Sequence, residues 1–228
     1  MESSEEKYIK DYPEPTFIEE TTTILRQMKK SVCRIFNTNG SKGTGFFGKI
    51  PLTDKTYIPV LITNCHVIQE ETEIEIKRYN EKYTRKINLE KRFKYANPKS
   101  DIFIIEMKEM KEDYEIEYLD LDDNVIKGNN LNFIGNSIYI LQYPGIFGDN
   151  KVAVSYGILK ERELKEKHNF HHYCWTEYGS SGSPILNLSN NKIIGIHKQR
   201  GNGEFNIGAF LSDTINEFLN KYKKKKYY

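Results

Sequence analysis

Cysteine is scarce in this sequence, which holds only Cys33, Cys65 and Cys174 among its 228 residues. An odd number without close spacing argues against a disulfide framework and against a cysteine-based metal site. Cys65 is therefore interpreted as a small buried apolar residue rather than a nucleophile. Because disulfides persist in oxidising compartments, their expected absence indicates a reducing, intracellular compartment.

Long apolar runs are also absent. The first seven residues, MESSEEK, are polar and charged, so no secretory signal is visible, and no stretch approaches the length that spans a bilayer. We therefore expect no membrane partner. The formal net charge of +2 is too small to indicate nucleic-acid binding by the chain as a whole. Only residues 221–228 are strongly basic, and they are interpreted as a solvated tail rather than an anchor to an anionic surface.

Two clusters of titratable residues lack the pattern of a metal site. The histidines of residues 168–172 (HNFHH) have no evident third ligand on a facing element, so this segment is interpreted as a polar loop that leads into a strand. The acidic residues 120–124 (DLDDN) lack the glycine and terminal glutamate of a calcium loop, and they are interpreted as a linker. We expect no metal and no organic cofactor.

Short apolar runs separated by polar clusters follow a charged segment that ends near residue 30. Such runs are typical of β-strands in a barrel or sandwich. The predicted strands before the linker are residues 32–36, 45–50, 58–63, 73–78, 83–89 and 102–107. Those after it are residues 137–142, 152–159, 172–176, 184–188, 192–197 and 205–209. Helices are predicted at 17–28 and from Ser212 to Tyr222, where apolar residues recur at i, i+3, i+4 and i+7.

The segment Gly179–Pro184 (GSSGSP) is the most informative motif. A serine between glycines on a tight turn projects its hydroxyl clear of the backbone, and two neighbouring amides can point at one spot. Acyl transfer needs this arrangement of a nucleophile beside an oxyanion hole. Gly/Ser turns are also common loop connections, so the motif alone is compatible with a plain hairpin.

Two further residues favour a catalytic role for this motif over a plain hairpin. His66 follows an apolar strand-like run at its exit, and Asp101 opens another. Each alone is compatible with a structural role at a strand end. Together with Ser181 they fit a catalytic triad, in which Asp101 orients His66 and His66 takes the proton of Ser181.

These stretches resemble the trypsin/chymotrypsin-like serine endopeptidases, and most closely their bacterial glutamyl-endopeptidase branch. The resemblance covers roughly residues 31–220 and rests on segments 43–46 (GTGF), 62–67 (ITNCHV), 100–102 (SDI), 179–184 (GSSGSP) and 193–197 (IIGIH). It implies that Ser181, rather than Ser180 or Ser183, is the nucleophile. It also implies that the backbone amides of Gly179 and Ser181 form the oxyanion hole.

The resemblance further implies an all-β fold of two six-stranded antiparallel barrels with the active site between them, plus a C-terminal helix. We expect a first barrel over residues 31–124 with His66 and Asp101, and a second over 125–211 with Ser181. Residues 212–228 form the helix and basic tail. Residues 1–30 are an extension that secreted relatives lack, and a propeptide, a lid and a structural strap all remain open for it.

In glutamyl-endopeptidase relatives, a threonine five residues before the nucleophile and a histidine in the following strand line the pocket for the P1 side chain. Thr176 and His197 occupy these positions. A hydroxyl and an imidazole suit a carboxylate, which needs hydrogen-bond donors when it leaves water, and a protonated ring would add charge. The alternative is that Gly-Ile-His is a strand sequence shared by relatives with other substrates.

The sequence thus predicts a serine endopeptidase that acts on a protein or peptide substrate, with a possible preference for acidic P1 residues. A narrowly specific processing or effector protease and a non-catalytic binding module of the same fold remain alternatives. A purely structural β-domain with chance motifs is disfavoured, because the three triad residue types occur together.

Overall fold

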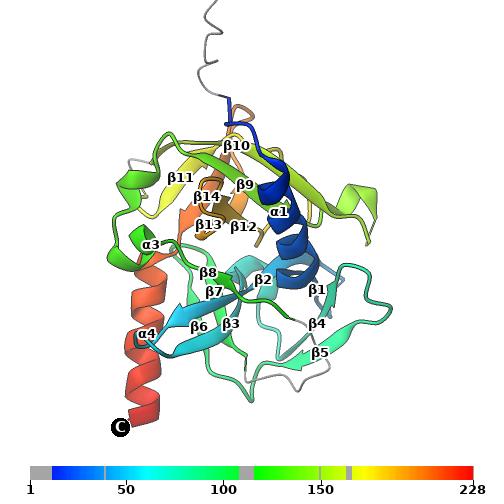
Figure 1. Ribbon diagram of the computed structural model, residues 1–228. Coiled ribbons are helices and arrows are strands. Elements are labelled where there is room, and N and C mark those ends of the chain that lie inside the picture. The colour runs from blue at the N-terminus through cyan, green and yellow to red at the C-terminus, as the bar shows by residue number, and fades with distance from the viewer. Residues whose placement is uncertain (1–11, 39, 108–115, 149, 163–165, 228) are drawn as a thin grey trace, which may run out of the picture.

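The computed structural model describes residues 12–38, 40–107, 116–148, 150–162 and 166–227. Two β units lie one above the other in Figure 1, with the long C-terminal helix α4 (Ser212–Tyr227) running down one side. The lower unit is the N-terminal sheet, β1 to β8, and the upper unit is the C-terminal barrel, β9 to β14. Within the described chain, no helix combines the length and apolar character needed to cross a membrane.

The N-terminal sheet has eight strands in the order β5-β4-β1-β2-β3-β7-β6, and β8 pairs in parallel with β2. Buried and more exposed side chains alternate along its strands as apolar and polar residues do in the sequence. In β4, for example, Ile74 and Ile76 are buried between charged neighbours. The strands are β1 (Val32–Phe36), β2 (Lys42–Pro51), β3 (Tyr57–Asn64), β4 (Glu73–Arg78), β5 (Arg85–Asn88), β6 (Lys94–Asn97), β7 (Ile102–Glu106) and β8 (Leu119–Asp120).

The expectation of a closed six-stranded first barrel is wrong for this sheet. β5 pairs only with β4, and β6 only with β7, so no ladder joins the two edges among the described strands. Each edge strand has only four residues. Neither β6 nor β8 was predicted, because their short sequences carry little apolar alternation.

The C-terminal half confirms the predicted six-stranded barrel, which closes in the order β10-β11-β14-β13-β12-β9. Its strands are β9 (Ser137–Gln142), β10 (Ala153–Arg162), β11 (Asn169–His172), β12 (Pro184–Asn187), β13 (Ile193–Arg200) and β14 (Asn206–Phe210). The strand predicted at 172–176 is wrong. Residues 169–172 form β11 instead, because Asn169, Phe170 and His172 are buried where they pair with β14.

Short helices connect these parts. Helix α2 (Cys65–Ile68) follows β3, α3 (Asp123–Lys127) begins where the acidic linker was predicted, and the 3-10 turns η1 (Asn130–Phe133) and η2 (Gly145–Phe147) flank β9. Within this connection Asp122 also has a local role, because its carboxylate accepts a hydrogen bond from the amide of Asn124 and caps α3.

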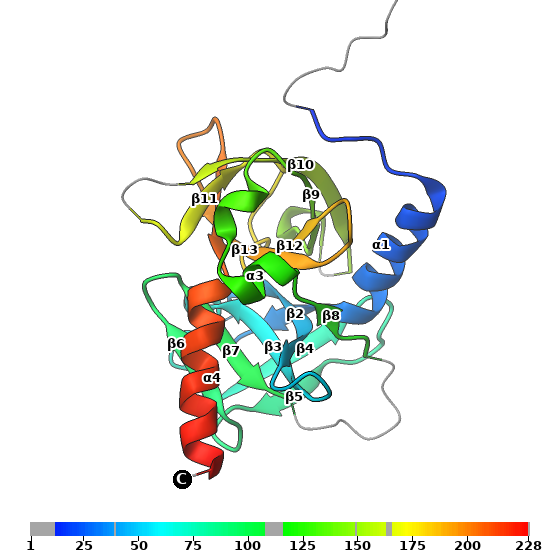
Figure 2. The ribbon, with the colours of Figure 1, turned by 60° about the vertical axis from the view of Figure 1, so that its left-hand side comes forward.

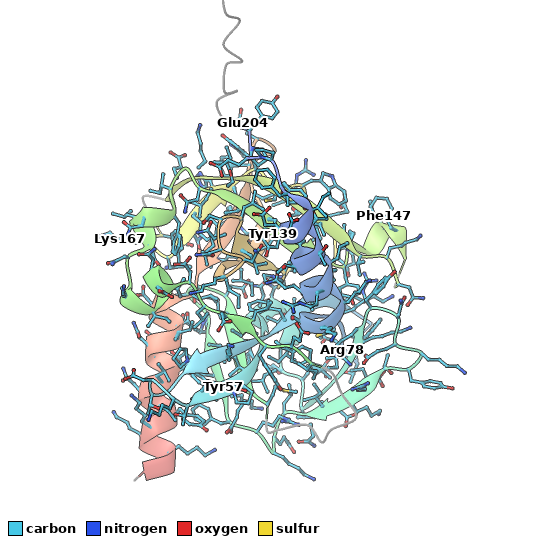
Figure 3. The ribbon with its side chains drawn as sticks, in the orientation of Figure 1. Tyr57, Arg78, Tyr139, Phe147, Lys167 and Glu204 are labelled. Atoms are coloured by element: carbon cyan, nitrogen blue, oxygen red, sulfur yellow. The ribbon has the colours of Figure 1, made fainter. Side chains whose placement is uncertain are left out.

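One apolar core extends through both units, and helices at each end of the chain add to it. Helix α1 (Ile18–Ser31) buries Ile24 and Met28 in this core, and its Gln27 accepts a hydrogen bond from Tyr139 Oη (2.6 Å). Tyr139 lies beside α1 in Figure 3. The predicted C-terminal helix is confirmed as α4, whose Phe218 packs edge-on against Phe93 of the N-terminal half. Figure 2 shows α1 and α4 on opposite sides of the molecule, with α1 beside the C-terminal barrel and α4 running along the N-terminal sheet.

Candidate active site

His66 and Asp101 form a tightly defined pair at the edge of the N-terminal sheet. His66 lies in α2, immediately after β3, and Asp101 immediately precedes β7, which pairs with β3. The distance from His66 Nδ1 to Asp101 Oδ2 is 2.6 Å, and the His66 amide donates to Asp101 Oδ1 at 3.0 Å. The His66 side chain is 50% exposed while that of Asp101 is 14% exposed, so the outer face of the imidazole is open.

The backbone of Asp101 is held as firmly as its carboxylate. Its carbonyl oxygen accepts hydrogen bonds from the Cys65 amide (3.1 Å) and from Asn64 Nδ2 (2.8 Å). Its φ of 59° lies in the left-handed region, which aspartate tolerates better than most residues. Residues 64–66 and Asp101 are therefore joined by four hydrogen bonds, which fix the orientation of the imidazole.

The three serines of the GSSGSP turn have different environments. Ser180 and Ser183 are both 0% exposed. The Ser180 hydroxyl accepts a hydrogen bond from the Glu177 amide, and the Ser183 hydroxyl has no partner within the described chain. Ser181 alone lines a pocket. The geometry therefore singles out Ser181 as the accessible hydroxyl of the turn.

The amides of this turn divide into two groups. Those of Ser180, Gly182 and Ser183 donate to the carbonyls of Glu177, His197 and Ser180, respectively. The amides of Gly179 and Ser181 donate to no acceptor in the described part of the chain. Two free N–H groups that flank one accessible hydroxyl are the donors that an oxyanion hole requires.

Residues of the N-terminal sheet hold the turn in place. The Thr44 amide donates to the Ser181 carbonyl at 2.8 Å, and Thr44 Oγ1 donates to the Gly179 carbonyl at 2.8 Å. Gly182 has a φ of 88°, and a Cβ there would overlap the Thr44 carbonyl oxygen and Thr63 Oγ1. Glycine is thus required at 182 both for its backbone conformation and for this close approach.

The hydroxyl of Ser181 is not hydrogen-bonded to His66 in this structure. Within the described residues, Ser181 Oγ donates to the Lys198 carbonyl at 3.2 Å. His66 nevertheless lies close to this turn in the fold, because Gly182, the residue after Ser181, packs against Thr63 at the end of β3, and β3 leads directly into α2 with His66. The structure therefore joins His66 to Asp101 and places Ser181 nearby, without the third hydrogen bond of a triad.

A pocket of about 590 Å³ opens beside Ser181, and both residues predicted to contact the P1 side chain, Thr176 and His197, line it. Part of its wall is aromatic: Trp175 is 46% exposed and its ring lies 5.9 Å from that of Phe147. Figure 3 shows Phe147 at the outer edge of the C-terminal barrel.

His197 is buried and contacts a second buried histidine, which was expected where a polar loop meets the predicted strand 172–176. The distance from His197 Nδ1 to His172 Nε2 is 3.2 Å, and both side chains are nearly inaccessible. Burial lowers the pKa of His197 to about 3, with a smaller contribution from His66, so the ring is neutral near pH 7 and carries no charge toward the pocket. Burial, with the neighbouring His197, also lowers the pKa of His172 well below its usual value.

Sequence reasoning also missed three charged residues of the pocket wall, Glu177, Arg200 and Glu204. Arg200 could have been found if β13 had been extended beyond His197. The strand continues because a bulge between His197 and Gln199 lets it keep pairing with β14. Glu204 lies at the top of the barrel in Figure 3, and its loop position carries no sequence signal.

The three histidines considered as a metal cluster point to different partners. His171 stacks on Phe205 with ring centroids 3.7 Å apart, His172 faces His197, and His168 Nε2 lies 3.6 Å from Glu166. No group of three or more metal-ligating side chains gathers in the part of the chain that the structure describes.

Similarity to known proteins agrees with this geometry at the level of the fold. The Rv3671c protease of M. tuberculosis, in an inactive form, superposes with a TM-score of 0.64 at 16% identity, covering 94% of this chain and 98% of that one. A serine endoprotease from Yersinia pestis gives 0.62 at 13% identity, covering 92% and 69%, and Deg5 gives 0.61 at 15% identity, covering 87% and 91%.

No curated protein sequence matches the chain. The family model described as a trypsin-like peptidase domain matches residues 43–196, which contain His66, Asp101 and Ser181. The resemblance to the glutamyl-endopeptidase branch stays a prediction. By the extent of the family match, the chain belongs to the trypsin-like peptidase domain family.

Proposed function

We propose that this protein is a serine endopeptidase in which Ser181 is the nucleophile, His66 the general base and Asp101 the residue that orients the base. The observation that carries the proposal is the accessible Ser181 hydroxyl between two free amides, in a pocket close to a histidine whose Nδ1 is held by a carboxylate. Nucleophile, oxyanion donors and oriented base are the three groups that acyl transfer needs.

The mechanism begins with rotation of the Ser181 side chain away from the Lys198 carbonyl, a motion of picoseconds to nanoseconds for an accessible side chain. Asp101 accepts a hydrogen bond from the Nδ1–H of His66, which keeps that proton, so Nε2 is the nitrogen that takes the Ser181 proton. The Ser181 oxygen then attacks the peptide carbonyl, and the oxyanion is bound by the amides of Gly179 and Ser181. His66 returns its proton to the leaving amine, and water hydrolyses the acyl-enzyme by the same steps in reverse.

The edge of β13 offers a place for the substrate backbone. The β12 ladder meets β13 only as far as Ile196, and His197 continues it by hydrogen bonds with Gly182 and Ser183. Beyond that point β13 extends to Arg200, beside Ser181. An extended peptide that adds to this edge would bring its carbonyl to the nucleophile.

An acidic P1 side chain would fit the hydrogen-bonding pattern of the two buried histidines. His172 Nδ1 has no partner within the described chain. If His172 carried its proton there, a buried N–H would be left without an acceptor, which is rare. The proton therefore belongs on His172 Nε2, which donates to His197 Nδ1. This leaves His197 with its proton on Nε2, a neutral donor to a carboxylate that Thr176 Oγ1 can also bind.

A binding module that retains the fold without turnover is the second candidate. The hydrogen bond from Ser181 to the Lys198 carbonyl favours it, because the nucleophile and the base are unconnected in this structure. Both candidates predict peptide binding in the same cleft, so turnover separates them.

Hydrolysis of a peptide library by wild type and single variants tests the proposal. Ser181→Ala should lower kcat about 10⁴- to 10⁶-fold, because triad members act as a unit. Ser183→Ala is a matched control, because its buried hydroxyl has no partner to lose within the described chain, and it should keep full activity. Absence of turnover by the folded wild type, with peptide still bound, would establish the binding module instead.

The acidic P1 preference has its own test. His197→Ala should lower kcat/KM for a Glu substrate more than for the matching Gln substrate, by about 1.5–3 kcal/mol, the range of a hydrogen bond to a charged group. Cleavage of the library after Lys, Arg or large apolar residues would overturn the pocket assignment. It would leave the triad proposal standing, because the two rest on different residues.

A further inference from the structure

Arg34 is a buried charged residue that the proposed mechanism does not use. It lies in the middle of β1 and is 0% exposed, although arginine is seldom fully buried without partners. Its neighbours Cys33 and Ile35 point into the separate core of the N-terminal sheet, whereas Val32 belongs to the core shared by both units. Because side chains alternate along a strand, Arg34 is on the Val32 face and is directed toward the C-terminal barrel.

The guanidinium binds residues 143–148, which follow β9, contain η2 and lie beside the GSSGSP turn. Arg34 Nη2 donates to the Tyr143 carbonyl at 3.1 Å, and Nη1 donates to the Gly148 carbonyl at 3.0 Å. These two carbonyls lie on either side of Gly145 in the sequence. A planar guanidinium with a fixed fork of donors can hold both at once, which the single ammonium of lysine cannot do with the same geometry.

Gly145 in turn binds the peptide that supplies one of the two oxyanion donors. Its amide donates to the Tyr178 carbonyl at 2.6 Å. The Tyr178 carbonyl and the Gly179 N–H belong to the same peptide unit, which is planar and trans, so they point in opposite directions. The hydrogen bond that holds the Tyr178 carbonyl toward Gly145 therefore keeps the Gly179 N–H directed away from Gly145. In that direction the Gly179 N–H has no acceptor within the described chain.

The guanidinium also fills the space behind this peptide. Arg34 Nη2 lies 3.3 Å from the position that a Cβ on Gly179 would take, and 3.4 Å from that of a Cβ on Gly145. With Gly179 at a φ of 88°, the peptide adopts a conformation that few other residues allow. Packing against Arg34 leaves little room for the peptide to rotate.

We propose that Arg34 is a positioning residue for the oxyanion hole: it clamps residues 143–148 so that Gly145 keeps the Tyr178–Gly179 peptide in its donor orientation. The inference rests on the proposed serine-peptidase function. Because Arg34 comes from the N-terminal sheet, docking of the two units and formation of the oxyanion hole are one event. Arg34 touches no substrate atom, so its effect is expected in transition-state binding and not in ground-state binding.

Two substitutions at Arg34 and one control variant test whether Arg34 positions the oxyanion hole. Arg34→Met removes both donors and leaves an unbranched apolar side chain, and Arg34→Lys keeps the charge but loses the fork. Tyr139→Phe is the control, because it removes a hydroxyl elsewhere in the fold that donates a buried hydrogen bond to Gln27 and also lies 3.1 Å from Asn191 Oδ1. For each folded variant we would measure kcat, KM and two affinities. The first is for a peptidyl trifluoromethyl ketone, which forms a tetrahedral adduct, and the second is for the product peptide.

We expect Arg34→Met to lower kcat about 10- to 100-fold, since a misplacement of about 1 Å can cost about 10²-fold. Affinity for the ketone should fall in parallel, while KM and product affinity change less than about threefold. Arg34→Lys should have a kcat between those of wild type and Arg34→Met. If Arg34→Met does not fold, the kcat of Arg34→Lys alone tests the proposal. The Tyr139→Phe variant should lose stability with kcat unchanged.

A kcat within about twofold of wild type in Arg34→Lys and Arg34→Met would overturn the proposal. So would equal losses of ketone and product affinity, which would show a general distortion of the cleft. Failure of the underlying function looks different, because wild type would then form no ketone adduct and Ser181→Ala would match it.

Discussion

Acidification should unfold this protein through two buried imidazoles, His172 and His197. Both rings are neutral in the folded state, since burial lowers the pKa of His197 to about 3 and that of His172 well below its usual value. In the unfolded chain each ring binds a proton near the ordinary value of 6.5. Between these limits the unfolded state holds more protons, so the free energy of unfolding must fall as the pH is lowered.

The size of the effect follows from the width of this window. Each pH unit below the unfolded pKa costs about 1.4 kcal/mol per histidine until the folded pKa is reached. At about pH 4.5, two units below the unfolded value, His197 alone should cost about 2–3 kcal/mol relative to pH 7. His172 acts in the same direction, and above the unfolded pKa neither ring contributes.

Urea unfolding at about pH 7 and pH 4.5 measures this difference directly. In His197→Gln the loss of unfolding free energy between the two pH values should be smaller than in wild type by about 2–3 kcal/mol. His171→Gln is the matched control, because His171 lies next to His172 on β11 but contacts Phe205 and Glu161 rather than the buried pair, and it should retain the wild-type difference. An unchanged pH difference in His197→Gln would refute the assignment of a buried neutral ring.

Two other outcomes are expected. Gly182→Ala should destabilise the protein by more than about 2 kcal/mol and abolish activity, because the new Cβ would overlap the Thr44 carbonyl oxygen at a left-handed φ; a variant that keeps the wild-type Tm would contradict the close approach. Dithiothreitol should leave the Tm unchanged, because all three cysteines are free; a large drop in Tm would reveal a disulfide.

Much of the fold could be predicted because its strands carry strong local signals. The runs at 32–36, 73–78 and 137–142 match β1, β4 and β9 residue for residue, since each combines apolar or β-branched residues with clear breaks. The C-terminal barrel was implied by the family resemblance, and the number of strands predicted after the linker agrees with it. The open N-terminal sheet could not be predicted, because closure depends on whether two four-residue edge strands meet, and no local signal encodes a non-local ladder.

The candidate site, like the fold, could be predicted where local motifs indicate it and could not where tertiary pairing determines it. The sequence motifs and the family resemblance together predicted which residues would carry the chemistry, and the structure pairs His66 with Asp101 and places Ser181, Thr176 and His197 around one pocket. The contact of His172 with His197 was not predicted, because the strand was expected at 172–176. The position of His172 is set instead by the pairing of β11 with β14. Arg34 gave no signal at all, because nothing in the sequence tells a buried arginine in a strand from a surface one.

The N-terminal extension illustrates a question that only tertiary contacts answer. From the sequence, a propeptide, a lid and a strap were equally open. Helix α1 buries Ile24 and Met28 in the core shared by both units, and Gln27 Nε2 donates to the Asn191 carbonyl at 2.9 Å. These contacts favour the strap, because removal of α1 would expose apolar surface of both units.

Covalent labelling by a fluorophosphonate tests the central claim most directly, because the reagent reacts with a serine activated by a base beside an oxyanion hole. Mass spectrometry of digested wild type should locate one adduct, on Ser181, and His66→Ala should greatly slow its formation. Ser180→Ala and Ser183→Ala should label as wild type does. An adduct on another serine, or labelling that persists in Ser181→Ala, would contradict the account.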